Sequence, residues 1–125
     1  MTIQAVLFDL DDTLYGEFSV CDRLGLEAAG AYAAAQTSID AAIATEAMNR
    51  GRLMLRESSL DEPESHDRTL FAKLGLELLG INPILYAEGM HEAYWKAVLD
   101  NMQRREGVLE LLTDLKTAQI PVGIC

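Results

Sequence analysis

Residues 5–15 read Ala5-Val6-Leu7-Phe8-Asp9-Leu10-Asp11-Asp12-Thr13-Leu14-Tyr15. An apolar run ends at Asp9, and two more carboxylates and a threonine follow within the next four residues. A run of this kind is typical of a strand buried on both faces, usually in a parallel sheet. Because open parallel sheets bind ligands at the carboxyl ends of their strands, we expect Asp9 and Asp11 to lie at such an edge.

The two carboxylates at positions 9 and 11 indicate a cation. Their charges repel each other, and a bound metal would relieve the repulsion. Oxygen donors on a tight turn suit a hard ion, so we predict that Asp9 and Asp11 bind Mg²⁺. The alternative is that Asp11, Asp12 and Thr13 only form a polar turn. The apolar strand, the spacing of the carboxylates and the following Thr-Leu pair together favour the metal site.

The segment 8–14 resembles the first motif, D-x-D-x-T/V-L, of the haloacid dehalogenase-like (HAD) hydrolase superfamily. The resemblance implies that Asp9 is a nucleophile that forms an aspartyl-phosphate and also binds Mg²⁺. It implies that Asp11 is the general acid and base, with its backbone carbonyl also bound to the metal. An aspartate at position 11 is similar to the phosphatases and phosphotransferases of the superfamily rather than to its dehalogenases.

The remaining positions of the motif are expected to support the loop and the phosphate. By the same resemblance, Thr13 braces the loop. We assign Leu10 and Asp12 to the same supporting role.

Composition and charge bound the other possibilities. The chain has 125 residues and a net charge of −10, which argues against nucleic acid as a partner because phosphate backbones require clustered Lys and Arg. No apolar stretch is long enough for a membrane span, and Met1-Thr2-Ile3-Gln4 lacks the basic start of a signal peptide. The distant cysteines Cys21 and Cys125 indicate neither a metal site nor a disulfide, so we expect a cytoplasmic protein.

The middle of the chain predicts helices and little else. After a strand over residues 3–8 and a loop over 9–19, helices are expected over residues 20–36, 39–56, 69–79 and 83–99, with a loop over 58–67. In the second helix, Ile43, Ala47, Leu53 and Met54 are expected on or near one face.

The last residues return to an α/β pattern. An amphipathic helix is expected over residues 105–116, followed by an apolar strand over 119–125 that lies parallel to the first strand. We therefore predict an α/β fold in which residues 1–14 and 102–125 form a partial Rossmann-like HAD core. Residues 15–101 form an inserted helical domain, which the resemblance identifies as a C1 cap that closes over the active site.

The predicted activity is Mg²⁺-dependent hydrolysis of a small phosphorylated metabolite. The Ser or Thr, the Lys and the acidic residues of the later HAD motifs have no place in this sequence. We therefore expect it to be an N-terminal portion that is not competent alone and that is completed by a C-terminal segment or chain. A phosphotransferase or phosphomutase of the same superfamily, and a non-catalytic binding module with a degenerate HAD fold, are the alternatives.

Overall fold

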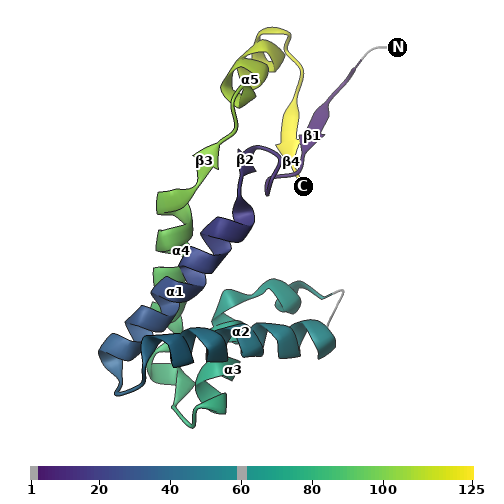
Figure 1. The fold of residues 1–125 in the computed structure, drawn as a ribbon. Coiled ribbons are helices and arrows are strands. Elements are labelled where there is room, and N and C mark those ends of the chain that lie inside the picture. Colours follow the sequence, from purple (N-terminus) through teal and green to yellow (C-terminus); the bar gives the residue numbers. More distant parts are fainter. Residues whose placement is uncertain (1–2, 59–61) are drawn as a thin grey trace. The chain divides into compact units, whose positions relative to one another are not determined.

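The computed structural model describes residues 3–58 and 62–125, which form two compact units (Figure 1). Unit 1 contains the described residues up to Val20 together with Asn101–Cys125, and unit 2 contains Cys21–Asp100. The first boundary falls inside helix α1 (Phe18–Gln36), a few residues later in the chain than the predicted start of the helical domain. That unit 1 is a HAD core and unit 2 its cap stays a prediction.

Unit 1 contains a small parallel sheet. Strand β1 (Val6–Phe8) pairs with β4 (Val122–Ile124) in the register Val6↔Val122, Leu7↔Gly123 and Phe8↔Ile124. Helix α5 (Val108–Thr117) precedes β4 along the chain. This parallel pairing agrees with the predicted α/β class, although both strands are shorter than the apolar runs that predicted them.

A second pair of strands in unit 1 was not predicted. The residues immediately after the carboxylate motif form β2 (Tyr15–Gly16), which pairs antiparallel with β3 (Gln103–Arg104). The backbone N–H of Arg105 extends this ladder by donating to the carbonyl of Leu14 at 3.1 Å. The part of unit 1 that follows the motif is therefore tied to the segment that returns from unit 2.

Unit 2 consists of helices. Beyond α1, it contains α2 (Ala41–Ser58), α3 (Arg68–Leu78) and α4 (Ala87–Asn101), with short 3₁₀ helices η1 (Pro63–His66) and η2 (Pro83–Leu85). Asp67 caps α3 by accepting from the N–H groups of Thr69 and Leu70 at 2.8 and 3.2 Å. The four predicted helices are confirmed with shifted ends. Within the predicted loop over 58–67, residues 59–61 lie outside the described residues.

Of the four apolar residues predicted on or near one face of α2, only Ala47 is buried. Ile43, Leu53 and Met54 are 55%, 48% and 46% exposed, and the buried residues of the helix are Ala44, Ala47, Met48 and Gly51. The reason is the close approach of α3: a Cβ on Gly75 would lie 2.8 Å from the carbonyl oxygen of Ala47. At this distance, only small residues fit where the two helices approach most closely.

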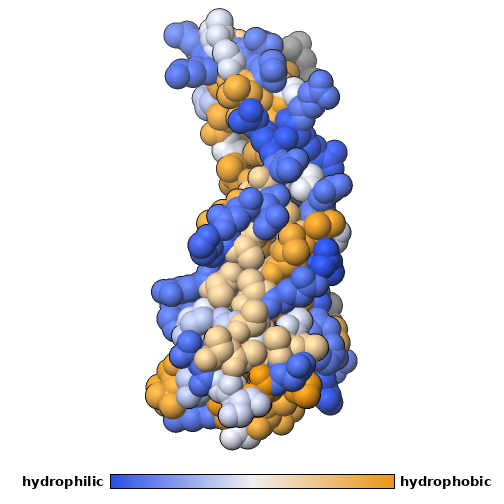
Figure 2. Space-filling model, turned by 60° about the vertical axis from the view of Figure 1, so that its left-hand side comes forward, coloured by the Kyte–Doolittle hydropathy of each residue, from blue (hydrophilic) through white to orange (hydrophobic). Residues whose placement is uncertain are grey.

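Apolar side chains are also exposed on the parallel sheet. Leu7 is 72% and Ile124 is 64% exposed. Figure 2 shows hydrophobic side chains (orange) at the surface among hydrophilic ones. Within the described parts of the chain, no helix has the length and apolar character needed to cross a membrane.

Candidate active site

The carboxylate motif forms a tight turn directly after β1. The carbonyl oxygen of Leu10 accepts from the N–H groups of Thr13 and Leu14 at 3.3 and 3.0 Å. Asp12 occupies the left-handed backbone region with φ 57°, which aspartate tolerates better than most residues because its short side chain bonds locally. The turn reverses the chain between β1 and β2 and holds the carboxylates at the strand end.

Asp9 is the first residue after β1, and its side chain is exposed. The hydroxyl of Thr13 donates to its Oδ2 atom at 3.3 Å. A hydroxyl contact of this kind orients the carboxylate and leaves its charge uncompensated, so Asp9 is held in place and stays open to a ligand. The bracing role of Thr13 stays a prediction.

Asp11 is held by a residue that sequence reasoning did not single out. The hydroxyl of Tyr15 donates to Oδ1 of Asp11 at 2.6 Å, and the Tyr15 side chain is buried. The contact depends on the turn at Asp12 and on the β2–β3 ladder, and no periodicity in the sequence indicates it. Its effect is to fix the direction of the Asp11 carboxylate.

The carboxylate of Asp12 points to a different use. Its Oδ1 atom accepts from the backbone N–H of Phe18 at 3.1 Å, at the first residue of α1. Asp12 therefore satisfies a donor at the beginning of this helix, as acidic caps do. Nothing in this contact bears on the phosphate role predicted for Asp12 or for Leu10, and both stay predictions.

The turn borders an apolar hollow in unit 1. The cavity of about 340 Å³ is lined by Leu10, Leu14 and apolar residues of α5, with Arg104 as its cationic member. Arg104 is placed there by its pairing with Tyr15 across β2 and β3. The lining is suited to packing against further apolar atoms rather than to a charged ligand.

The donor set at the turn fits Mg²⁺. Asp9 and Asp11 supply carboxylate oxygens, and Mg²⁺ is commonly held by one or two carboxylates, with water and substrate phosphate completing its shell. Among residues 3–58 and 62–125, no three His, Cys, Asp or Glu side chains cluster as a ready metal cage.

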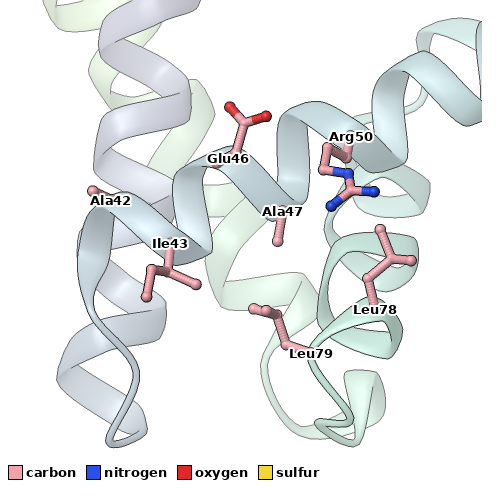
Figure 3. A pocket seen from close by; sticks show the side chains of 7 residues that line it. All are labelled: Ala42, Ile43, Glu46, Ala47, Arg50, Leu78 and Leu79. Carbon is pink, nitrogen blue, oxygen red and sulfur yellow. The ribbon is translucent and has the colours of Figure 1, made fainter.

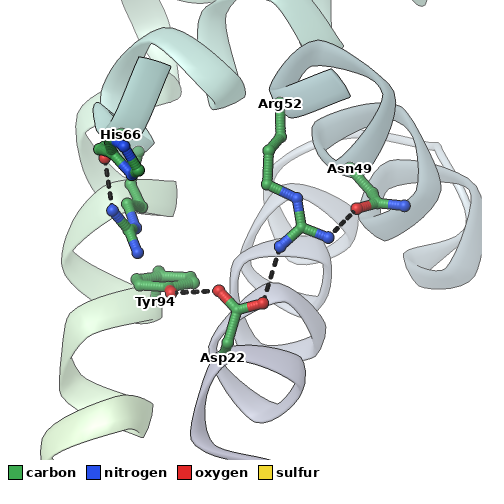
Figure 4. Close-up of polar contacts among 6 residues, drawn as sticks. Asp22, Asn49, Arg52, His66 and Tyr94 are labelled. Carbon is green, nitrogen blue, oxygen red and sulfur yellow. Dashed lines mark hydrogen bonds and ion pairs between the residues drawn. The ribbon is translucent and has the colours of Figure 1, made fainter. Parts of the chain in front are cut away.

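A contrasting carboxylate lies in unit 2. Figure 4 shows Asp22 between two donors: Oδ1 accepts from the Tyr94 hydroxyl at 2.5 Å, and Oδ2 forms an ion pair with Arg52 at 2.7 Å. Burial of Tyr94, followed by its hydrogen bond to Asp22, raises the pKa of this phenol to about 12. Because its two carboxylate oxygens bind groups from α4 and α2, Asp22 joins three helices and serves the fold.

Arg68 completes this cluster from α3. Its guanidinium lies over the rings of Phe71, Tyr94 and Trp95, at 5.8, 5.5 and 5.3 Å from their centroids. It also donates to the carbonyl of His66. These cation–π contacts hold the beginning of α3 against α4.

Comparison with known proteins points to phosphatase chemistry. No protein-family model matches the chain. It is 32% identical over 124 residues to a protein of Halopiger xanaduensis (strain DSM 18323 / JCM 14033 / SH-6) named ribulose-1,5-bisphosphate 5-phosphatase. The match covers 96% of this chain and 51% of the relative, so the chain spans about half of that protein's length. The chain is thus similar to the corresponding part of a phosphatase.

Proposed function

We propose that the complete protein is a HAD-type phosphatase that hydrolyses a small phosphate ester with Mg²⁺. The observation that carries the proposal is the placement of Asp9, an exposed carboxylate at the end of a parallel strand, held by the hydroxyl of Thr13. The similarity to a protein named as a phosphatase supports the same chemistry. In this proposal unit 2 is the cap domain.

The first step is nucleophilic attack by Asp9. One carboxylate oxygen forms a bond to phosphorus while the bond from phosphorus to the ester oxygen breaks, which gives an aspartyl-phosphate. The leaving oxygen takes a proton from the carboxyl group of Asp11. The hydrogen bond from Tyr15 restricts Asp11 to one orientation, so that its second oxygen can serve as the proton donor.

The second step returns the enzyme to its starting state. Asp11, now a carboxylate, takes a proton from water as the water oxygen attacks phosphorus. The bond between phosphorus and Asp9 breaks, and inorganic phosphate leaves. When bound, Mg²⁺ neutralises negative charge on the phosphoryl oxygens and on Asp9. The carboxylate of Asp9 and the carboxylate or backbone carbonyl of Asp11 would hold it.

The substrate class follows from the relative and from the chemistry. The relative's name specifies a sugar bisphosphate. We propose that this protein acts on a small phosphorylated metabolite, and a sugar bisphosphate is the first compound to assay.

The decisive experiment traps the covalent intermediate. The complete protein is mixed with Mg²⁺ and a sugar bisphosphate, quenched in acid and digested, and the peptide that contains Asp9 is analysed by mass spectrometry. We expect one added phosphoryl group on Asp9, and no addition in Asp9→Asn. The matched control Asp114→Asn changes an exposed carboxylate on α5 and should retain both the adduct and turnover. If Asp9→Asn still released phosphate, the nucleophile assignment would be wrong.

A further inference from the structure

Helix α2 presents a regular stripe of exposed side chains. Ile43, Glu46, Arg50 and Leu53 follow one another at spacings of three, four and three residues, which is the spacing of one seam of a coiled coil. All four are exposed, Ile43 and Leu53 to 55% and 48%. Small residues on the neighbouring face already pack α2 against α3, so the stripe is available to a second element.

The stripe borders a hollow that an incoming side chain can fill. A cavity of about 360 Å³ lies between α2 and α3 and is lined by Ile43, Arg50 and Leu78, among others (Figure 3). In Figure 3 Ile43 and Arg50 are turned toward α3, whereas the side chain of Glu46 points away from it. Residues three and four positions apart lie along one flank of a helix, and Glu46 borders the same cavity as Ile43 and Arg50, so the apolar wall and the two charges adjoin one another.

The surface carries one negative and one positive side chain, Glu46 and Arg50. Glu46 and Arg50 are four residues apart on one helix, a spacing at which opposite charges can pair. Among the residues that the structure describes, neither takes part in an ion pair. Both are exposed, so they can pair with charges on another molecule.

We propose that a second copy of this chain docks on the stripe, with the two α2 helices antiparallel. An antiparallel pairing centred on Met48 places Glu46 opposite Arg50 of the second copy, since each lies two residues from the centre. The same pairing places Ile43 opposite Leu53, each five residues from the centre. Because a two-fold interface repeats every contact, two ion pairs form at its middle and two apolar pairs flank them.

The size of the contact predicts a reversible dimer. An 18-residue helix is about 27 Å long, and one helix pair buries less than the roughly 800 Å² per partner of a standard stable interface. Leu78, which is 45% exposed beside the stripe, adds to the apolar area. We therefore expect monomer and dimer to exchange with concentration.

Charge reversal tests both the surface and the register. Sedimentation velocity of the complete protein over a concentration series should show the dimer. Glu46→Arg and Arg50→Glu each place like charges opposite one another at two symmetry-related positions, so each variant should weaken association at least about tenfold. The double variant carrying both changes should dimerise again, because every pair is then restored with its charges exchanged.

Mixing the two single variants provides the matched control for folding. In a mixed pair, the arginines of one chain face the glutamates of the other at both positions, so a 1:1 mixture should form a heterodimer although neither variant dimerises alone. A monomer at every concentration, a dimer that the reversals leave unchanged, or single variants that fail to associate on mixing would each overturn the proposal. The proposed phosphatase activity is assayed separately and does not bear on the result.

Discussion

In unit 2 the carboxylate of Asp22 binds the hydroxyl of Tyr94 and the guanidinium of Arg52. In unit 1 the carboxylates of Asp9 and Asp11 bind hydroxyls of residues four positions further along the chain. The positive charge of Arg52 offsets the cost of burying the Asp22 carboxylate. The hydroxyl groups that donate to Asp9 and Asp11 orient these carboxylates but do not neutralise their charge.

Under the proposed function, this difference separates a structural carboxylate from a catalytic one. Asp22 is partly buried and links α1, α2 and α4, so its charge is used within the fold. Asp9 and Asp11 lie at a strand end with exposed charges of the same sign, an arrangement that contributes little to the fold. A local arrangement that is unfavourable for stability is expected where a ligand is to be bound.

The largest effect is expected from Asp9→Asn. Under the proposed mechanism this variant removes the nucleophile, so phosphatase activity of the complete protein should fall at least about 10³-fold. Because the side chain is exposed, the free energy of unfolding should change by no more than about 0.5 kcal/mol. Initial rates and urea unfolding of the same preparation measure both. If Asp9→Asn lost stability together with activity, Asp9 would be a carboxylate that stabilises the fold, as Asp22 does.

The opposite response is expected from Asp22→Ala. The change leaves the Tyr94 hydroxyl, on a side chain that is 0% exposed, without its acceptor and removes the counter-charge of Arg52. We expect a loss of about 3 kcal/mol in the free energy of unfolding, measured by urea titration. Asp22→Asn, which keeps an acceptor oxygen, should lose less. Equal losses in the two variants would show that the hydrogen bond to Tyr94 contributes nothing.

The sequence predicted the carboxylate motif but not the contacts that hold it. The apolar run before Asp9 and the later apolar run each predicted a strand, and the two strands pair in parallel as expected. The hydrogen bond from Tyr15 to Asp11 depends on a left-handed residue at Asp12 and on strands two residues long. Strands so short have no alternation of apolar and polar residues that a sequence could reveal.

The helices show a different limit of the sequence pattern. The first helix ends at residue 36 as predicted. The helices predicted from residues 39 and 83 begin later, at Ala41 and Ala87, because Asp40 accepts from the N–H of Ala42 and residues Pro83–Leu85 form the short helix η2. Apolarity alone does not indicate which face of α2 is buried, since Ile43 and Leu53 are exposed. The contact with α3 is close enough that Gly51 and Gly75 decide which face is turned inward. Such an approach of two backbones depends on both helices at once.

The pH dependence of stability tests the buried side of the contrast. Burial raises the pKa of Tyr94 to about 12, the hydrogen bond to Asp22 acts in the same direction, and Arg68 opposes both. In the unfolded chain the phenol titrates near its ordinary value of about 10, so between these values the unfolded state has lost a proton that the folded state keeps. Stability from this group is therefore complete below about pH 10 and falls, by about 2 kcal/mol, as the pH rises to about 12.

Urea unfolding at intervals from pH 9 to pH 12 measures this loss. Tyr94→Phe provides the reference, because it differs from the parent protein in this one titratable group alone. The difference between the two curves should narrow as the pH rises. A constant difference would mean that the Tyr94 phenol titrates alike in both states, and that its burial does not disfavour the charged form.

The smallest effect is expected from Tyr15→Phe. Phenylalanine keeps the buried ring and removes only the hydroxyl that donates to Asp11, so the free energy of unfolding should fall by about 1 kcal/mol or less. Under the proposed mechanism the larger change is in catalysis, because Asp11 can then rotate away from the leaving oxygen. The rate of phosphate release should fall while Asp9 still accepts a phosphoryl group. If Tyr15→Phe instead lost as much stability as Asp22→Ala and left the rate unchanged, Asp11 would be a carboxylate that stabilises the fold. Asp9 would then be the one carboxylate of the turn that differs from Asp22 in its role.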